Sequence, residues 1–300
     1  MTKPPARPPA RSKTPAASSG DTTTPPGDRI AKVLARAGVA SRRDAERMIE
    51  EGRVAVNGKV ITRAALNVTD RDRITVDDKP LEAPEAPRLW LYHKPAGLVT
   101  TTKDEQGRRT IFDALPEDLP RVMSVGRLDL NSEGLLLLTN DGGIKRKLEL
   151  PSTGWLRKYR VRVNGRPTDD MLAPLRAGIV VDGQAFQPME VTLDRQQGAN
   201  AWLTIGLREG KNREIRRAMT DIGLSVNRLI RVSYGPFQLG QLKQGEVEEL
   251  RPRVVRDQLG LEGAKSNRPQ PQRKRKPGPA TGKPVRNGPP KGPAKGPKRR

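Results

Sequence analysis

The stretch Val125–Gly142 reads VGRLDLNSEGLLLLTNDG and joins charged turn residues to a run of four leucines. A continuous apolar run bounded by turn residues is more typical of a buried strand than of a surface helix. We therefore predict a strand–loop–strand unit with Arg127 and Asp129 at the mouth of the loop. Asp is common in turns, whereas a charged group held against a sheet is costly unless it is paired or used. This stretch alone does not decide between a structural and a chemical role for Asp129.

The composition limits the class of protein. A chain of 300 residues with 34% hydrophobic content can form one large or two small cores. Its formal charge of +23 indicates a polyanionic partner, either nucleic acid or an anionic membrane. No apolar run approaches the roughly 18 residues that span a bilayer, and the N-terminus has no signal-peptide pattern. We therefore expect a soluble, cytoplasmic protein without a membrane partner.

Several kinds of catalytic site are excluded by residue counts. The sequence has no cysteine, so disulfides, thiolate zinc sites and cysteine nucleophiles are excluded. Its one histidine, His93, excludes a multi-histidine metal cluster and is interpreted as a bystander. We expect neither a metal nor a cofactor.

The two ends of the chain are predicted to be disordered. Residues 1–28 form a leader rich in Pro, Ser and Thr, and residues 256–300 form a basic tail rich in Pro and Gly. From residue 263 onward the tail has thirteen Lys or Arg and no Asp or Glu. It is either a solvated tail or an arm that binds RNA without sequence preference, and we favour the arm.

Residues 29–78 are predicted to form a small domain. Two helices, Arg29–Ala37 and one that Ser41 opens with a Ser-x-x-Asp capping pattern, precede strands 53–56 and 59–61 around an Asn57-Gly58 hairpin turn. A further strand is predicted at 73–76, and residues 79–87 are predicted to form a linker. Basic side chains gather on or around the two helices: Arg36, Arg42, Arg43, Arg47 and Arg53. The run KVLARAGVASRRDAERMIEEGRVAVNGKV resembles the αL-type RNA-binding module of small-subunit ribosomal protein S-four, which implies that these arginines bind RNA backbone.

Residues 88–255 are predicted to form a second, α+β domain with a mixed or antiparallel sheet. The expected strands are 88–92, 156–163, 179–181, 188–193, 202–207 and 226–232. The expected helices are 111–115, 144–148, 169–177 after a Thr168 cap, and 211–222. Strand 156–163 alternates apolar and basic residues.

Four motifs occur in order in this domain. They are Lys94-Pro95, Gly126-Arg127-Leu128-Asp129, Lys158-Tyr159-Arg160-Val161 and EGKNREIRR at residues 209–217. Together they resemble the RsuA/RluB family of pseudouridine synthases, over essentially all of residues 29 to about 250. Asn131, the NREIRR run and RLIRV at 228–232 are most similar to the RluB branch, which modifies large-subunit (23S) ribosomal RNA.

The resemblance implies roles for individual residues. It implies that Asp129 is the nucleophile on a flipped-out uridine, that Arg216 pairs with a buried Asp129 and keeps it ionised, and that Tyr159 stacks on the uracil. Ile215 would pack against the base and Arg127 would contact RNA near it. Lys94 would contribute to substrate binding, with Lys94-Pro95 more simply read as the floor of the site. Whether Asp129 attacks the sugar carbon or the base, or promotes a glycal, stays open at this level.

Other readings compete with the enzyme. The same scaffold could be a catalytically idle RNA-binding or ribosome-assembly factor, or act on small-subunit RNA. The joint presence of Asp129, Tyr159 and Arg216 favours an enzyme. A DNA-binding protein would need a base-reading element, and no such motif is visible. We expect a monomer acting on ribosomal RNA or on the assembling large subunit.

Overall fold

The computed structural model describes residues 27–260. The predictions of disorder for residues 1–26 and 261–300 concern segments outside the described residues. None of the helices within residues 27–260 is long and apolar enough to cross a membrane.

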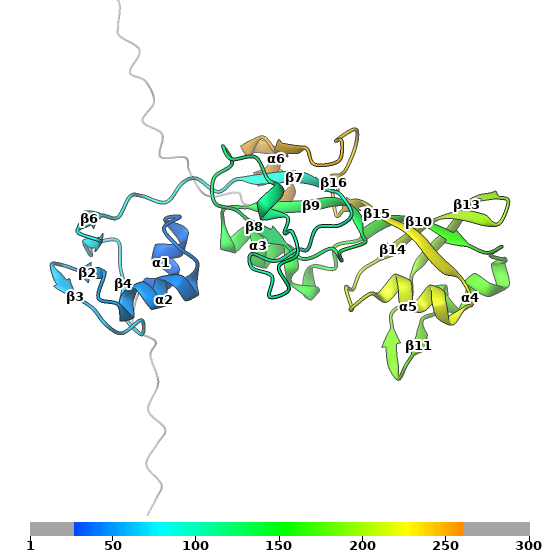
Figure 1. Cartoon of the computed structure of the whole chain (residues 1–300), viewed down its shortest axis with the longest axis horizontal. Coiled ribbons are helices and arrows are strands. Elements are labelled where there is room, and N and C mark those ends of the chain that lie inside the picture. Colours follow the sequence, from blue (N-terminus) through cyan, green and yellow to red (C-terminus); the bar gives the residue numbers. More distant parts are fainter. Residues whose placement is uncertain (1–26, 261–300) are drawn as a thin grey trace, which may run out of the picture. The chain divides into compact units, whose positions relative to one another are not determined.

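The N-terminal domain has two helices beside a small sheet (Figure 1). Its elements are β1 (Asp28–Arg29), α1 (Ile30–Arg36), α2 (Arg42–Glu50), β2 (Val54–Val56), β3 (Lys59–Val60), β4 (Asn67–Val68), β5 (Ile74–Val76) and β6 (Lys79–Pro80). The predicted cap of α2 is confirmed, because Ser41 Oγ accepts a hydrogen bond of 3.1 Å from the backbone N–H of Asp44. Asn57 and Gly58 have φ of 53° and 80°, as a tight hairpin between β2 and β3 requires. The apolar faces of both helices close over β2 and β5 in one core.

The boundaries of this domain differ from the predicted ones by a few residues. Asp28, assigned to the leader, pairs with Val68 in the β1–β4 ladder. Lys79 and Pro80, assigned to the linker, pair with β5 as the edge strand β6. Leu81 packs against the same core. Such short pairings have no hydrophobic periodicity to reveal them, since most of their residues are exposed.

The second domain is built on a nine-stranded mixed sheet, which confirms the α+β prediction. Its elements are β7 (Leu89–Lys94), η1 (Phe112–Ala114), β8 (Met123–Val125), β9 (Glu133–Thr139), α3 (Gly142–Glu149), η2 (Pro151–Thr153), β10 (Arg157–Asn164), α4 (Asp169–Ala177), β11 (Ile179–Val181), β12 (Gln184–Phe186), β13 (Glu190–Gln197), β14 (Asn200–Leu207), α5 (Glu214–Asp221), β15 (Ser225–Tyr234), β16 (Phe237–Gln238), β17 (Val247–Glu249) and α6 (Pro252–Leu259). The sheet runs β13-β14-β10-β15-β9-β7-β17, with β8 beside β9 and β16 beside β15. Strands β11 and β12 form a separate hairpin.

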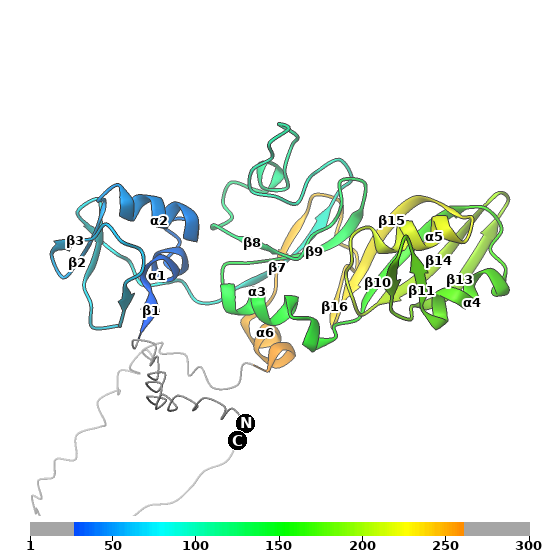
Figure 2. The ribbon, with the colours of Figure 1, turned by 90° about the horizontal axis from the view of Figure 1, so that it is seen from below.

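Strand β9 contains the leucine run and is buried along its whole length, as predicted. Leu135 and Leu137 pack with α3 and α6, which lie against one face of the sheet (Figure 2). Leu136 and Leu138 face the other side, in the core that includes residues of α4 and α5. Along one edge, β9 pairs first with β15 in parallel and then with β8 antiparallel. The loop between β8 and β9 therefore emerges where the two halves of the sheet meet.

The structure corrects several predicted bounds. Helix α5 begins at Glu214 rather than at residue 211, because Arg213 has a left-handed φ of 49°. The segment 111–115 is a 3₁₀ turn. Helix α6 continues to Leu259 and buries Val255 and Leu259, so the predicted domain end at residue 255 is too early.

Candidate active site

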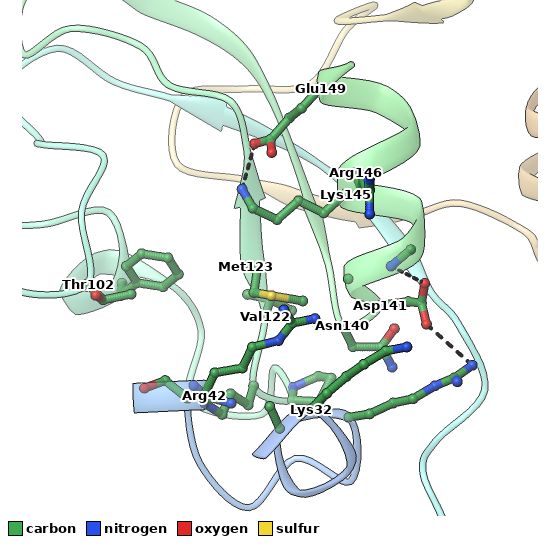
Figure 3. Close-up of a pocket in the computed structure, with 18 of the residues that line it drawn as sticks. Lys32, Arg42, Thr102, Val122, Met123, Asn140, Asp141, Lys145, Arg146 and Glu149 are labelled. Carbon is green, nitrogen blue, oxygen red and sulfur yellow. Dashed lines mark hydrogen bonds and ion pairs between the residues drawn. The ribbon is translucent and has the colours of Figure 1, made fainter. Parts of the chain in front are cut away.

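The loop 126–132 between β8 and β9 carries Asp129 and is held at several points. The N–H of Gly126 donates to Glu149 Oε1 on α3 at 2.6 Å. Figure 3 shows the second donor to this oxygen, Lys145 Nζ, at 2.5 Å. Further along, Thr100 Oγ1 donates to the carbonyl of Leu128 at 2.8 Å. The loop is therefore tied to the scaffold on both sides of Arg127.

Lys94, the last residue of β7, binds the second half of this loop through its side chain. Its side chain is fully buried, and Nζ donates to the carbonyl oxygens of Pro95 (2.9 Å), Asp129 (3.2 Å), Leu130 (3.4 Å) and Ser132 (2.9 Å). Burial lowers the pKa of Lys94 to about 8, while the negative charges of Asp129 and Glu133 oppose this shift. Lys94 has no exposed surface for touching a substrate, so this geometry corresponds to the floor of the site rather than to a substrate contact.

Asp129 itself is exposed, contrary to the expectation of a buried carboxylate. Within residues 27–260 its side chain has no hydrogen bond or ion pair, whereas its backbone carbonyl accepts from the N–H of Ser132 at 3.0 Å. The backbone of Asp129 is fixed and its carboxylate is directed to solvent. An unpaired carboxylate on a rigid loop is available to a ligand.

Arg216 lies close to this carboxylate without pairing with it directly. Its guanidinium donates to the carbonyl of Asn131 at 2.9 Å and to that of Val226 at 3.2 Å, so it links α5 to the loop and to β15. Burial, and then the charge of Arg213, lower the pKa of Arg216, and the charge of Asp129 opposes them. The predicted Asp129–Arg216 pairing is thus an electrostatic proximity in this structure.

Arg217, the next residue of α5, has a structural role. Its guanidinium donates to the carbonyl of Val181 at 3.0 Å and to Asp182 at 3.1 Å. Both contacts fasten α5 to the β11–β12 hairpin.

Tyr159 on β10 lies across the sheet from the start of β9. It is opposite Arg231 of β15, and Arg231 is opposite Gly134, which lies five residues after Asp129. Two strand spacings place Tyr159 roughly 10 Å from Gly134. The ring is 9% exposed and belongs to the same core as Leu128 and Ile215. The sheet therefore brings the neighbourhood of Asp129 together with Tyr159 and the start of α5.

Ile215 and Arg127 differ in their surroundings. Ile215 is 3% exposed at the start of α5, whereas Arg127 is exposed on the loop. Beside α5 lies a shallow hollow of about 320 Å³. Its lining combines three arginines, Arg213, Arg216 and Arg217, with two carboxylates, Asp182 and Asp221, and Asp182 is paired with Arg217.

Sequence reasoning missed the polar cluster that supports the junction of β9 and β15. Glu133 receives two hydrogen bonds from Arg228, at 2.9 and 2.8 Å, and one from Gln244 at 2.7 Å. Pairing with Arg228 lowers the pKa of Glu133. The available signal was a charged residue two positions before the run of four leucines, at what proves to be the first position of the buried strand β9.

A second missed feature is a carboxyl pair at the start of α5, formed by Glu209 of the preceding loop and Glu214, the first residue of the helix. Glu214 is 3% exposed, and its Oε2 accepts from the N–H of Lys211 at 3.0 Å. Burial and the neighbouring Glu209 raise the pKa of Glu214 to about 7. Among residues 27–260 no side-chain cluster of His, Asp and Glu has the size needed to hold a metal ion.

The five arginines predicted to bind RNA, Arg36, Arg42, Arg43, Arg47 and Arg53, are all exposed. Two of them have acidic partners within the N-terminal domain: Arg47 pairs with Asp44 at 2.8 Å and Arg53 with Asp77 at 2.7 Å. Within the described part of the chain, Arg42 and Arg43 form no ion pair. Their guanidinium groups are therefore free of carboxylate partners among the described residues.

Comparisons with known proteins identify the family of this chain. An RNA pseudouridylate synthase family model matches residues 88–221, and an S4 domain model matches residues 28–74. An RNA pseudouridine synthase of Rickettsia bellii is 46% identical over 228 residues, covering 76% of this chain and 99% of that protein. The chain belongs to the RNA pseudouridine synthase family.

Two further matches refine this placement. The ribosomal large subunit pseudouridine synthase B of Pseudomonas aeruginosa is 42% identical over 247 residues, which is 79% of this chain and 64% of that protein. A crystal structure of a pseudouridylate synthase aligns with a TM-score of 0.56 and 24% identity, over 77% of this chain and 99% of that one. At that identity, the structural match supports the fold of this synthase and no more.

Proposed function

We propose that this synthase converts a uridine of large-subunit (23S) ribosomal RNA to pseudouridine, with Asp129 as the nucleophile on a flipped-out nucleotide. The observation that carries the proposal is the exposed, unpaired Asp129 carboxylate on a loop that Lys94, Thr100 and Glu149 hold in place. The choice of large-subunit RNA rests on the relatives named for that activity, among them the Pseudomonas protein.

The chemistry requires no oxidant, and no fragment is released, because the uracil that leaves C1′ is joined to it again. The C1′–N1 bond of uridine breaks, the uracil turns, and C1′ bonds to C5, which loses its proton while N1 gains one. A carboxylate can serve as nucleophile in such a rearrangement, as it does at sugar carbons in glycosidases. The protein contributes a fixed position for Asp129 and a surface for the extruded base.

The neighbouring side chains have distinct roles in this proposal. Tyr159 provides the aromatic face against which the uracil stacks, and Ile215 packs against its edge. Arg216 holds the loop through the Asn131 carbonyl and supplies positive charge near Asp129. Arg127, together with Arg42 and Arg43 of the N-terminal domain, contacts phosphates around the target. We propose that the enzyme acts as a monomer in the cytoplasm on ribosomal RNA or the assembling large subunit.

Mapping pseudouridine across all ribosomal RNA, with and without this protein, tests the proposal. We expect the loss of pseudouridine at one or a few positions of large-subunit RNA, restored by the wild-type chain but not by Asp129→Asn. A change confined to small-subunit RNA would contradict the substrate. An unchanged map would favour an idle RNA-binding factor.

A further inference from the structure

The sheet has a second surface, on the face opposite Tyr159. Along β10, Tyr159, Val161 and Val163 are buried, and the alternate residues Lys158, Arg160 and Arg162 are exposed. Among the elements of residues 27–260, α4 and α5 lie on one side of this half of the sheet, and no helix lies on the other side (Figure 1). We call Lys158, Arg160, Arg162 and Trp202 the outer cationic strip.

The charges of the outer cationic strip have no acidic partners. Within residues 27–260, the side chains of Lys158, Arg160 and Arg162 form no ion pair and donate no hydrogen bond. Alternate residues of a strand are about 6.7 Å apart, which is similar to the separation of successive phosphates along an extended RNA strand. Three exposed cations in a row with this spacing match a polyanionic strand.

Trp202 adds an aromatic surface to these charges. It lies on β14 opposite Arg162 and is partly exposed. The guanidinium of Arg160 lies over its ring at 4.9 Å from the ring centre. Single-stranded bases stack on aromatic rings and on guanidinium planes beside cationic grooves.

The acidic residues of this region mark the edge of the strip. Asp194 and Glu190 lie on the edge strand β13, where Asp194 accepts from Thr204 at 2.8 Å and Glu190 lies 3.6 Å from Arg208. On the other flank, Glu133 of β9 is paired with Arg228. These carboxylates are bound by Thr204, Arg208 and Arg228, so none of them neutralises Lys158, Arg160 or Arg162 through an ion pair.

We propose that the outer cationic strip binds a single-stranded segment of the RNA substrate, with phosphates on Lys158, Arg160 and Arg162 and a base stacked at Trp202. This inference rests on the proposed function, because it assumes an RNA substrate. It gives that substrate a second point of attachment, on the side of the sheet away from Asp129. RNA that extends past the target nucleotide would then bind more tightly than a minimal target hairpin.

The test removes the three charges in the full-length chain by Lys158→Thr, Arg160→Thr and Arg162→Thr, since Thr is well tolerated in strands. The dissociation constant for a large-subunit RNA fragment with single-stranded flanks is measured across salt concentrations. Each lost phosphate contact on a single strand lowers the slope of log K against log salt by about 0.7, so we expect the slope to fall by about 2. The matched control removes three exposed cations at and just before α6 by Arg251→Gln, Arg253→Gln and Arg256→Gln, and its slope should change by less than half as much. Equal slopes for the triple variant and the control, at matched melting temperatures, would overturn the proposal and point to another partner for this face.

Trp202→Leu tests the stacking contact separately. We expect RNA affinity to fall about tenfold with no change in the salt slope, because stacking is worth about 1–3 kcal/mol per base and involves no counterion. An unchanged affinity would contradict the stacked base. Pseudouridine formation by the wild-type chain is scored in the same preparations. If the wild-type chain forms no pseudouridine, the proposed function fails; if it does and the slope is unchanged, only the strip fails.

Discussion

At the scale of single residues, the position of Asp129 depends on a buried ammonium group. Lys94 donates to four carbonyl oxygens, three of them in the Asp129 loop. A hydrogen bond to a charged group contributes about 1.5–3 kcal/mol and offsets part of the cost of burying the charge. Removing the ammonium leaves those carbonyls without their donor and frees the loop to move.

Lys94→Met should therefore lower kcat by about 100-fold, the effect of a misplacement of roughly 1 Å at a reacting group. The Kd for RNA should stay within about threefold, because Lys94 has no exposed surface. Single-turnover rates and equilibrium binding measure the two quantities. A kcat within twofold of wild type would contradict the role of Lys94 in holding the loop.

The pH dependence gives a second test of Lys94. Because burial lowers its pKa to about 8, the ammonium loses its proton as the pH rises through that value. Between about pH 8 and pH 10.5 the unfolded chain then binds more protons at Lys94 than the folded chain does. The contribution of Lys94 to folding stability therefore rises with pH in this range. The single-turnover rate should nevertheless fall above pH 8, because the neutral amine has lost one donor. In Lys94→Met the single-turnover rate should not decline above pH 8. If the decline persists in this variant, another titrating group causes it.

At the scale of elements, Gly134 allows β9 and β15 to meet. Its φ is +102°, and a Cβ there would lie 2.6 Å from the backbone nitrogen of Arg231. Gly134→Ala should lower the free energy of unfolding by about 3 kcal/mol, through backbone strain and separation of the two strands. Gly240→Ala is the control, because Gly240 also has a positive φ but open space around it. The free energies of unfolding are measured by urea denaturation. Equal losses of stability in the two variants would contradict the close approach of Gly134 to the backbone of Arg231.

The start of α5 should respond to pH through Glu214, the first residue of that helix. Its pKa is raised from 4.5 to about 7, so the folded chain binds more protons than the unfolded chain between these values. Stability from this group is complete below pH 4.5 and is lost as the pH rises through 7. Glu214→Gln, which cannot ionise, should be more stable than wild type above pH 7, on the order of 1–3 kcal/mol. Thermal melts across pH 5–8 that run parallel for both chains would refute this.

Many of the helices, strands and turns could be predicted from the sequence. The leucine run, the Ser41 and Thr168 caps and the Asn57-Gly58 turn follow local rules, and the structure confirms them. The start of α5 was missed because the left-handed Arg213 has no sequence signal. Helix α6 was missed because only Val255 and Leu259 mark its buried face. The support from Lys94 and Glu149 joins segments far apart in the chain, which no local pattern reveals.

At the scale of the whole molecule, the charge of +23 gives the synthase a large electrostatic attraction to RNA. Residues 263–300 alone carry thirteen cations. Deleting this segment should weaken RNA binding and flatten its salt dependence, while the rate at saturating RNA stays within about twofold. Titrations at several salt concentrations measure the RNA affinity and its salt dependence. An unchanged salt slope would show that the segment does not contact RNA.

The central claim is that Asp129 performs the chemistry and is not needed for binding. The most direct measurement compares wild type and Asp129→Asn on the same ribosomal RNA fragment, following both Kd and single-turnover pseudouridine formation. We predict a Kd within about threefold, because the loop keeps its backbone contacts, and a rate lower by about 10⁴-fold or more, as for loss of a nucleophile. Turnover near the wild-type rate, or loss of binding in parallel with activity, would contradict the account.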